Sequence, residues 1–381
     1  MTKILVRAPN WVGDSIMCTP AIAFLRGAFP SAGIIVMGRR HLGDIFGGNP
    51  HVSGFVAADD RQLDAETREG IIASRFDAVA LMPNSFRSAW VARRLGIPKR
   101  IGYSRNGRRL LLTHPIPYDP YEWQTPAAKP LGNRALRPIP ASKPGPWNRP
   151  PKHMVHYYMR IAERTAEALG SDARAGTLAR GSVPLVLPVD PEARKQIDAL
   201  LAGCGLEGRR LLGVAMASAN SPAKRWPPQR FAEACDRLAE EMDAEVVSLA
   251  YDREAAEAEA VARLMKRPLR RIGEKITLAG LVALVDRLDL LVTHDSGAMH
   301  IAAARETPTV AVFGPTDWNV TYPWSRRAEV VRVSPECAPC LLDKCPIDHR
   351  CMNAVTAEVV VAAARRLLAG PAPQAEAGGG R

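Results

Sequence analysis

Residues 289–317 read DLLVTHDSGAMHIAAARETPTVAVFGPTD, and this stretch contains the repeating unit from which the fold is predicted. The apolar runs at 290–292 and 309–313 predict two buried strands. A polar loop and a short helical pattern at 298–304 lie between them. Strand, loop, helix and strand form the repeating unit of a parallel sheet, so we expect an α/β fold. In such sheets, ligands bind outside the carboxyl ends of the strands.

The loop of this unit carries Asp295, Ser296 and Gly297 at the start of the predicted helix. The unpaired amides of a helix N-terminus suit an anionic ligand such as a phosphate. Asp295 also suits ribose hydroxyls, as acidic side chains do at other nucleotide sites. The structural alternative is that Asp295 or Ser296 only caps the helix. The loop alone leaves these interpretations open.

The composition is that of a soluble globular protein, with 47% hydrophobic and 24% charged residues among 381. No apolar run approaches the roughly 20 residues of a membrane span. The N-terminus, MTKILVRAPNWVGD, becomes polar too early for a signal peptide, so we expect a cytosolic protein with reduced cysteines. Residues 1–180 carry 26 Lys and Arg against 13 Asp and Glu, whereas 181–381 carry 25 against 26. This asymmetry predicts an anionic partner for the first half.

The chain opens with a short strand at 4–6, the loop RAPNWVGD and a helical pattern at 15–29. Asp14 lies where this helix begins. It is either a helix cap or a carboxylate held at the strand's carboxyl edge as a general base. Trp11 beside it would raise the pKa of such a base by excluding water.

The first half also contains a basic run. Eight basic residues and no acidic one occur from Arg87 to Arg109. Such runs are usually solvated faces. Arg87, however, closely follows the predicted strand at 76–82, and arginine binds carboxylates and phosphates through two parallel hydrogen bonds. We therefore predict Arg87 and Arg100 as ligands of an anionic acceptor.

The second half repeats the pattern with a strand at 211–216, the loop ASANSPAKRWPP and a helix at 229–242. Lys224 lies in the loop after the strand, where its ammonium can reach a phosphate across a cleft. The alternative is that Lys224 and Arg225 are an ordinary solvated pair.

These patterns predict the domain organisation of the chain. We expect an N-terminal domain at 1–180 and a C-terminal domain at 181–355. A final helix at 356–370 and a disordered tail at 371–381 follow them. The proline-rich segment 115–151 predicts a long surface loop within the first domain.

Four of the seven cysteines are clustered near the C-terminus, namely Cys337, Cys340, Cys345 and Cys351. A C-x₂-C pair with two further cysteines in a cytosolic chain is typical of a structural zinc site, with His349 as a spare ligand. The spacing is not a standard one, and four reduced thiols in a turn-rich segment are the alternative. Nothing in the pattern predicts a catalytic metal.

Four stretches together resemble the ADP-heptose:lipopolysaccharide heptosyltransferases, most closely the heptosyltransferase II type. They are ILVRAPNWVGDSIMCTPAI, then PNSFRSAW with RIGYSRNGRRLLL, then PAKRWPPQRFAEACDRL, and finally THDSGAMHIAAARETPTVAVFGPTD with CAPCLLDKCPIDHRCM. They occur in the family's order over nearly the whole chain, which is far more specific than any one motif. The proline-rich segment is longer than expected for the family.

The resemblance implies a GT-B fold, with two Rossmann-like domains facing across a cleft and the last helix crossing back to the first domain. It implies transfer of heptose, with inversion, from ADP-L-glycero-D-manno-heptose to a lipid A–Kdo–heptose type acceptor at the cytoplasmic face of the inner membrane. Asp14 then matches the catalytic base and Lys224 a donor-phosphate ligand. Asp295, Ser296, Gly297 and His300 match the nucleotide loop.

The chemistry of the residues agrees with this resemblance. An inverting transfer needs one base and no carboxylate nucleophile, and a positive charge opposite the leaving ADP. No Asp-x-Asp occurs in the sequence, so we expect neither a cofactor nor a catalytic metal.

Other functions remain open alternatives. A related transferase with a different acceptor or sugar nucleotide is hard to separate by sequence. A nicotinamide oxidoreductase is disfavoured because RAPNWVGD lacks the G-x-G-x-x-G fingerprint. Nucleic-acid binding is disfavoured because the basic run contains only Trp90 and Tyr103 as aromatic residues.

Overall fold

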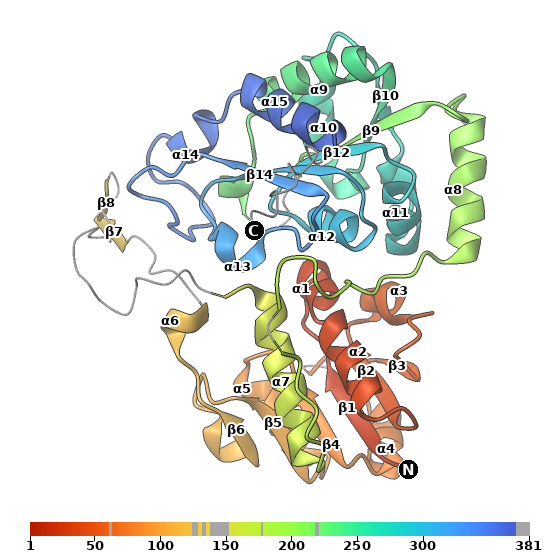
Figure 1. Cartoon of the computed structure of the whole chain (residues 1–381), viewed down its shortest axis with the longest axis vertical. Helices are drawn as coiled ribbons and strands as arrows, with labels where there is room; N and C mark the ends of the chain where they lie inside the picture. The colour runs from red at the N-terminus through yellow and green to blue at the C-terminus, as the bar shows by residue number, and fades with distance from the viewer. Residues whose placement is uncertain are drawn as a thin grey trace, which may run out of the picture.

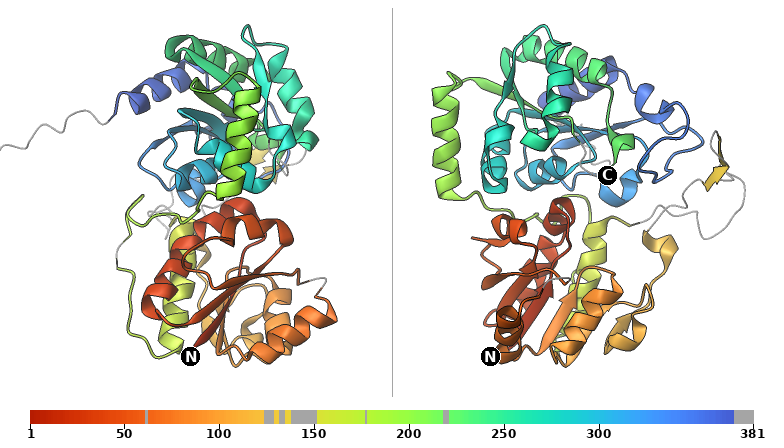
Figure 2. Two further views of the ribbon diagram at one scale, coloured as in Figure 1. Left: turned by 90° about the vertical axis from the view of Figure 1, so that its right-hand side faces the viewer. Right: turned by 180° about the vertical axis from the view of Figure 1, so that it is seen from behind.

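The computed structural model describes residues 1–60, 63–123, 129–131, 135–137, 152–176, 178–217 and 221–370. Two α/β halves lie one above the other, and each is built on a six-stranded sheet (Figure 1). The same two-part arrangement is seen from the side and from behind (Figure 2). The predicted α/β class with two Rossmann-like units is confirmed. The predicted tail, 371–381, and most of the proline-rich segment lie outside the described residues.

The two sheets have the same topology. In spatial order, the first sheet consists of β3 (Gly54–Ala57), β2 (Gly33–Gly38), β1 (Lys3–Arg7), β4 (Ala78–Leu81), β5 (Lys99–Tyr103) and β6 (His114–Ile116). The second consists of β11 (Leu269–Arg271), β10 (Ala244–Ser248), β9 (Arg210–Ala215), β12 (Leu290–His294), β13 (Thr309–Phe313) and β14 (Ala328–Arg332). All pairings within both sheets are parallel. This order reverses direction beside β1 and beside β9, and the crevice at that point is where doubly wound sheets bind ligands.

Helices cover both faces of each sheet. Those of the first half are α1 (Val12–Met17), α2 (Thr19–Ala28), α3 (Gly43–Phe46), α4 (Ala65–Ser74), α5 (Phe86–Arg94), α6 (Pro120–Trp123) and α7 (Met154–Ala168). Those of the second are α8 (Pro191–Gly203), α9 (Pro228–Met242), α10 (Ala255–Ala262), α11 (Leu278–Val285), α12 (Gly297–Ala304), α13 (Trp318–Thr321), α14 (Arg350–Asn353) and α15 (Ala357–Leu368). None of the helices in the described part of the chain is long and apolar enough to cross a membrane.

The helix predicted at 15–29 is two helices, and Pro20 explains the break. Proline has no amide hydrogen to donate to the carbonyl of Ile16, four residues earlier. The hydroxyl of Thr19 donates to that carbonyl instead, at 2.8 Å. Cys18 separates α1 from α2. The short α1 can therefore point its first turn toward the second half.

The link between the halves is bonded to both of them. The amide of Val186 donates to Thr19 Oγ1 at 2.9 Å, and Asn49 Nδ2 donates to the Val186 carbonyl at 3.1 Å. The carbonyl of Leu187 accepts from Arg305 of the second half at 2.9 Å. These bonds fix the chain where it passes between the sheets. The domain boundary at 180/181 itself stays a prediction.

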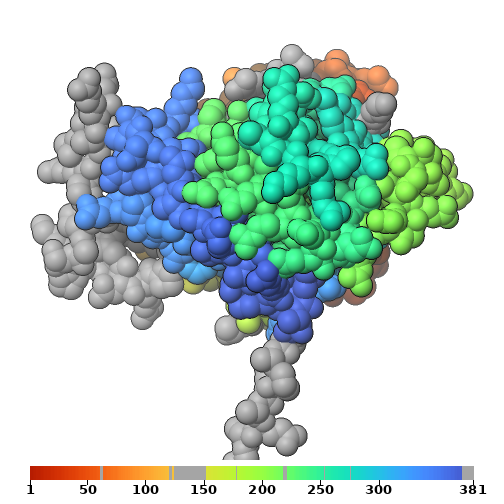
Figure 3. Space-filling view, turned by 90° about the horizontal axis from the view of Figure 1, so that it is seen from above, coloured from red at the N-terminus to blue at the C-terminus, as the bar shows by residue number. Residues whose placement is uncertain are grey.

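The expectation that the last helix crosses back to the first half is wrong. Helix α15 packs against α9, β13 and β14 of the second half. Its apolar side, which includes Val360 and Val361, is buried in the same core as Phe231 and Leu238 of α9. Seen from above, α15 (dark blue) lies on the outer face of the second half beside the green helices (Figure 3). The buried apolar side of α15 therefore faces the second sheet and not the first half.

The described parts of the proline-rich segment are not a plain loop. They contain the end of β6, helix α6 and an antiparallel pair, β7 (Lys129–Leu131) with β8 (Ala135–Arg137). Trp123 at the end of α6 is buried and packs edge-on against Tyr103 and Tyr157. This aromatic contact anchors α6 to the first half.

Candidate active site

Asp14 lies in the first turn of α1, just beyond the carboxyl end of β1. Its Oδ1 accepts a hydrogen bond of 2.8 Å from the hydroxyl of Tyr158 on α7. Burial raises the pKa of Asp14 above its ordinary value, and the negative charge of Asp295 raises it further, although the Tyr158 bond opposes this. A carboxylate with a raised pKa is a better proton acceptor, as a general base requires. Trp11 is 55% exposed, so the expected shielding by its ring is not seen.

The first turn of α1 meets α12 of the second half at very short range. A Cβ atom on Gly13 would lie 2.5 Å from Cδ2 of His300, and one on Gly297 would lie 3.6 Å from Val12. The His300 ring is therefore packed on the backbone beside Asp14. Burial lowers the pKa of His300 to about 4, so the ring is neutral at physiological pH. Residues from both halves thus meet in one place.

Lys224 and Asp295 form an ion pair in the second half, with Nζ 2.9 Å from Oδ2. Asp295 follows β12, and Lys224 ends a short 3₁₀ helix, η4 (Pro222–Lys224), that follows β9. Since β9 and β12 are neighbours, their carboxyl ends bring the two side chains together. Burial alone would raise the pKa of Asp295, but the attraction and hydrogen bond of Lys224 help to bring it below its ordinary value. The pair is thus charged and lies opposite Asp14, whose pKa both of its members influence.

Ser296 is the N-cap of α12, as the structural alternative predicted. Its Oγ accepts from the Met299 amide at 3.5 Å and lies 3.1 Å from Thr293 Oγ1. Gly297 is the first residue of the helix. A cap of this kind leaves other first-turn amides without intrahelical partners, and these suit an anion. The cap and the anion site are therefore compatible roles for this loop.

An open pocket of about 250 Å³ lies at the carboxyl ends of β13 and β14. Its lining includes Thr316, Asp317, Trp318, Asn319, Arg332 and Ser334. The guanidinium of Arg332 lies 4.6 Å from the centre of the Trp318 ring. Hydroxyl, carboxyl and amide groups beside an aromatic ring are suited to a hydroxyl-rich ligand. The pocket extends the polar surface of the second half at this edge of its sheet.

Comparisons with known proteins agree with this geometry. The family model for glycosyltransferase family 9 (heptosyltransferase) matches residues 65–127 and 148–350. The chain belongs to this family. It is 28% identical over 351 residues to lipopolysaccharide heptosyltransferase 2 of Escherichia coli K12, covering 87% of this chain and 88% of the relative.

Two solved structures share the fold of this family 9 glycosyltransferase. The E. coli ADP-heptose lps heptosyltransferase II superposes with a TM-score of 0.74 at 25% identity, over 97% of this chain and 99% of the other. A family 9 glycosyl transferase from Veillonella parvula superposes with a TM-score of 0.76 at 22% identity, over 97% of both chains. The GT-B architecture predicted from the sequence is confirmed.

The two arginines predicted to bind the acceptor have different surroundings in this glycosyltransferase. Arg87 is exposed in the first turn of α5, close to the carboxyl end of β4. Arg100 is the second residue of β5, at the opposite end of the sheet, and it donates to the carbonyls of Leu111 at 2.7 Å and Ile97 at 2.6 Å. The structure therefore does not bring Arg100 to the site, and its guanidinium ties together the chain segments that precede and follow β5.

Sequence reasoning missed Tyr158 as the partner of Asp14 in this glycosyltransferase. Tyr158 fits one side of a helical pattern at 152–169, so only packing is expected of it from the sequence. A buried phenol needs a hydrogen-bond partner, and that need is the signal that pointed beyond packing. Burial raises the pKa of Tyr158 well above its ordinary value, so the hydroxyl keeps its proton and donates to Asp14. Tyr158 thus holds one carboxylate oxygen of Asp14 in place.

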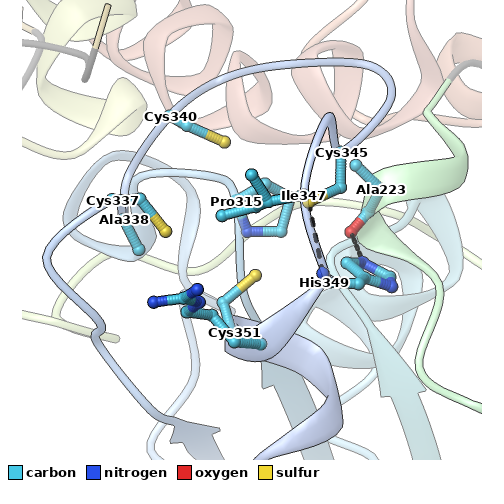
Figure 4. A pocket seen from close by; sticks show the side chains of 10 residues that line it. Ala223, Pro315, Cys337, Ala338, Cys340, Cys345, Ile347, His349 and Cys351 are labelled. Atoms are coloured by element: carbon cyan, nitrogen blue, oxygen red, sulfur yellow. Dashed lines mark hydrogen bonds between the residues drawn. The ribbon is translucent and has the colours of Figure 1, made fainter. Parts of the chain in front are cut away.

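The four clustered cysteines surround a small cavity together with Ala223, Pro315 and His349 (Figure 4). Burial raises the pKa values of Cys337, Cys340 and Cys351. Among the residues that the structure describes, no group of three or more His, Cys, Asp or Glu side chains is arranged to hold a metal ion. The structural zinc stays a prediction from the spacing, and no chemical role in transfer is assigned to a metal.

Proposed function

We propose that this family 9 glycosyltransferase transfers heptose from ADP-L-glycero-D-manno-heptose to the heptose-containing inner core of lipopolysaccharide, with inversion. The observation that carries the proposal is that α1, which carries Asp14, contacts α12 beside the Lys224–Asp295 pair, so that both charges of the pair act on the Asp14 carboxyl. A proton acceptor from one half thus lies opposite a positive charge from the other. The names of the relatives support the choice of ADP-heptose and of the lipopolysaccharide core.

In the proposed reaction, Asp14 accepts the proton of an acceptor hydroxyl while the hydroxyl oxygen bonds to the anomeric carbon of heptose. The bond from that carbon to the phosphate oxygen breaks on the opposite side, and ADP leaves with the electron pair. Lys224 and the first-turn amides of α12 stabilise the negative charge that develops on ADP. One displacement of this kind inverts the anomeric centre and requires no covalent intermediate.

We also propose that the first half binds the anionic acceptor and contacts the cytoplasmic face of the inner membrane peripherally. Exposed apolar residues and arginines lie together on α5 and on the 3₁₀ helix η2 (Arg109–Leu111), which contact each other. Phe86 is 49%, Trp90 40% and Leu110 87% exposed. An apolar surface surrounded by arginines suits the interface of an anionic membrane.

The function is tested with the purified chain, ADP-heptose and lipopolysaccharides truncated at successive core lengths. ADP release should require one particular core length, and NMR of the product should show the inverted anomer. Turnover with another sugar nucleotide but not ADP-heptose would favour a related transferase. Sugar transfer with retention of configuration would contradict the mechanism.

Membrane contact is tested by sedimentation with vesicles containing phosphatidylglycerol and with neutral vesicles. The double variant Trp90→Ser/Leu110→Ser should bind anionic vesicles at least several-fold more weakly and keep its ADP affinity. The matched control is Leu264→Ser, which removes an exposed apolar side chain from the second half. If the wild type and both variants bind the vesicles equally, the exposed side chains of α5 and η2 do not contact the membrane.

A further inference from the structure

The cysteine-rich segment 337–351 contacts the loop that carries Lys224, and this contact has no role in the function proposed so far. The backbone of Ala223, the residue before Lys224, is bonded to this segment through both of its polar groups. Its amide donates to the Asp343 carbonyl at 3.0 Å, and its carbonyl oxygen lies 2.5 Å from Nε2 of His349. Since a carbonyl only accepts, Nε2 of His349 carries the proton. Figure 4 shows the His349 ring directed at Ala223.

Further bonds make the segment a firm support for this loop. The hydroxyl of Ser221 also reaches the Asp343 carbonyl, at 3.4 Å. On the other side of Lys224, the buried Trp226 donates from its indole to the Val355 carbonyl at 2.9 Å, just beyond the segment. The described residues on both sides of Lys224 are thus fixed to the C-terminal part of the chain.

The segment is itself anchored to the loop after β13. The amide of Leu341 donates to the Pro315 carbonyl at 2.8 Å, and a Cβ atom on Gly314 would lie 2.3 Å from Sδ of Met352. The amide of His349 donates to Sγ of Cys345 at 3.3 Å, which orients the residue that reaches Ala223. The position of the His349 ring is therefore set from several directions.

We infer that His349 is a positioning residue for Lys224: by holding the Ala223 carbonyl, it fixes the point from which the lysine side chain reaches Asp295 and the donor phosphates. The inference rests on the proposed donor role of Lys224. A lysine side chain has four rotatable bonds, so the ammonium keeps one position only if its backbone is fixed. Loss of the His349 bond would also leave a buried carbonyl without its partner.

The test is ADP binding by calorimetry to the full chain with His349→Met and His349→Gln. Both substitutions place an unbranched side chain of similar length at a residue with a φ of 56°, so their backbone strain is similar. Only glutamine retains an N–H near the position of Nε2. We expect His349→Met to weaken ADP binding roughly 5- to 20-fold, and His349→Gln to stay within about 2-fold of the wild type. The KM for the acceptor should not change.

A double-mutant cycle with Lys224→Ala separates positioning from general stability. If His349 acts through Lys224, His349→Met should have almost no further effect on ADP affinity in the Lys224→Ala background. Equal ADP affinities of the Met and Gln variants, or fully additive effects in the cycle, would overturn the inference. If Lys224→Ala alone leaves ADP affinity unchanged, the donor assignment in the proposed function fails instead. Thermal melting of every variant confirms that the proteins compared are folded.

Discussion

Gly13 packs against the imidazole ring of His300, so closely that a Cβ atom on residue 13 would lie 2.5 Å from Cδ2 of that ring. The two residues belong to opposite halves of the chain, on α1 and α12. Because residue 13 has no side chain, the two helices approach closely enough for Asp14 to face Lys224 and Asp295. This contact therefore sets the spacing of the proposed active site.

Gly13→Ala should lower kcat at least tenfold, because the added methyl group forces α1 and α12 apart and misplaces the base. The matched control is Gly27→Ala in α2, where a Cβ atom would meet nothing within 4 Å. Steady-state kinetics of both variants and a crystal structure of Gly13→Ala check the prediction. Normal turnover by Gly13→Ala would mean that the close contact is not needed for transfer.

Asp14→Asn should lower kcat by roughly 10²- to 10⁴-fold, the usual contribution of a general base. ADP affinity should be retained, because asparagine can still accept from Tyr158 and carries no charge toward Asp295.

The folded-state pKa of Asp14 is raised, so its ionisation destabilises the fold as pH rises above the ordinary value of 3.8. The Asn variant should therefore melt at a higher temperature than the wild type at pH 7, and this difference should disappear below about pH 4. Near-normal turnover would reduce Asp14 to a structural residue of α1.

Lys224→Ala should weaken ADP binding roughly 10- to 100-fold, because it removes a positively charged hydrogen-bond donor and leaves the Asp295 carboxylate without its ion-pair partner. The neighbouring Arg225 is the control, since its guanidinium pairs with Glu257 at 2.7 Å instead. Calorimetric titration with ADP should show that Arg225→Ala binds like the wild type. If Lys224→Ala changes only the acceptor kinetics, the phosphates of the donor do not bind at Lys224.

His300 should make the fold sensitive to mild acid. Burial lowers its pKa from 6.5 to about 4, so between these pH values the unfolded chain binds more protons than the folded one. Stability therefore falls as pH drops through this window, and His300→Gln should remove part of that slope. Urea unfolding of both proteins from pH 7 to pH 4 measures the difference. Parallel curves for wild type and variant would show that His300 does not titrate in this way.

Arg87→Ala should raise the acceptor KM about tenfold and leave the donor KM unchanged, because Arg87 lies at the cleft end of α5. Arg94 lies in the last turn of the same helix over the Trp90 ring, at 4.8 Å, and its removal should have a small effect. Arg100→Ala should lower stability and not acceptor affinity, because its guanidinium holds backbone carbonyls. Equal, small effects of Arg87→Ala and Arg94→Ala on acceptor kinetics would make the basic run a solvated face.

The sequence alone determined the two strand–helix repeats and most of the residues that meet in the cleft. The loops that follow three apolar strands carry Asp14, Lys224 and Asp295. The apolar pattern predicts where such a strand ends, and ligands bind at the carboxyl ends of parallel strands. The central strands β1, β4, β9, β12 and β13 were predicted because buried parallel strands are continuous apolar runs. Edge strands such as β11, with the sequence LRR, have no such run and were missed.

Which residues far apart in the sequence come together depends on how the elements pack. The bond from Tyr158 to Asp14 spans 144 residues, and that from His349 to Ala223 spans 126. The expectation that α15 lies on the first half came from the family resemblance. Hydrophobic periodicity could not correct it, because it indicates which face of a helix is buried but not which surface buries it. The sequence likewise could not show why residue 13 is a glycine, because the His300 ring that leaves no room for a side chain there belongs to the other half of the chain. Local pattern thus fixed the elements, while contacts between residues far apart in sequence fixed the distances on which the chemistry depends.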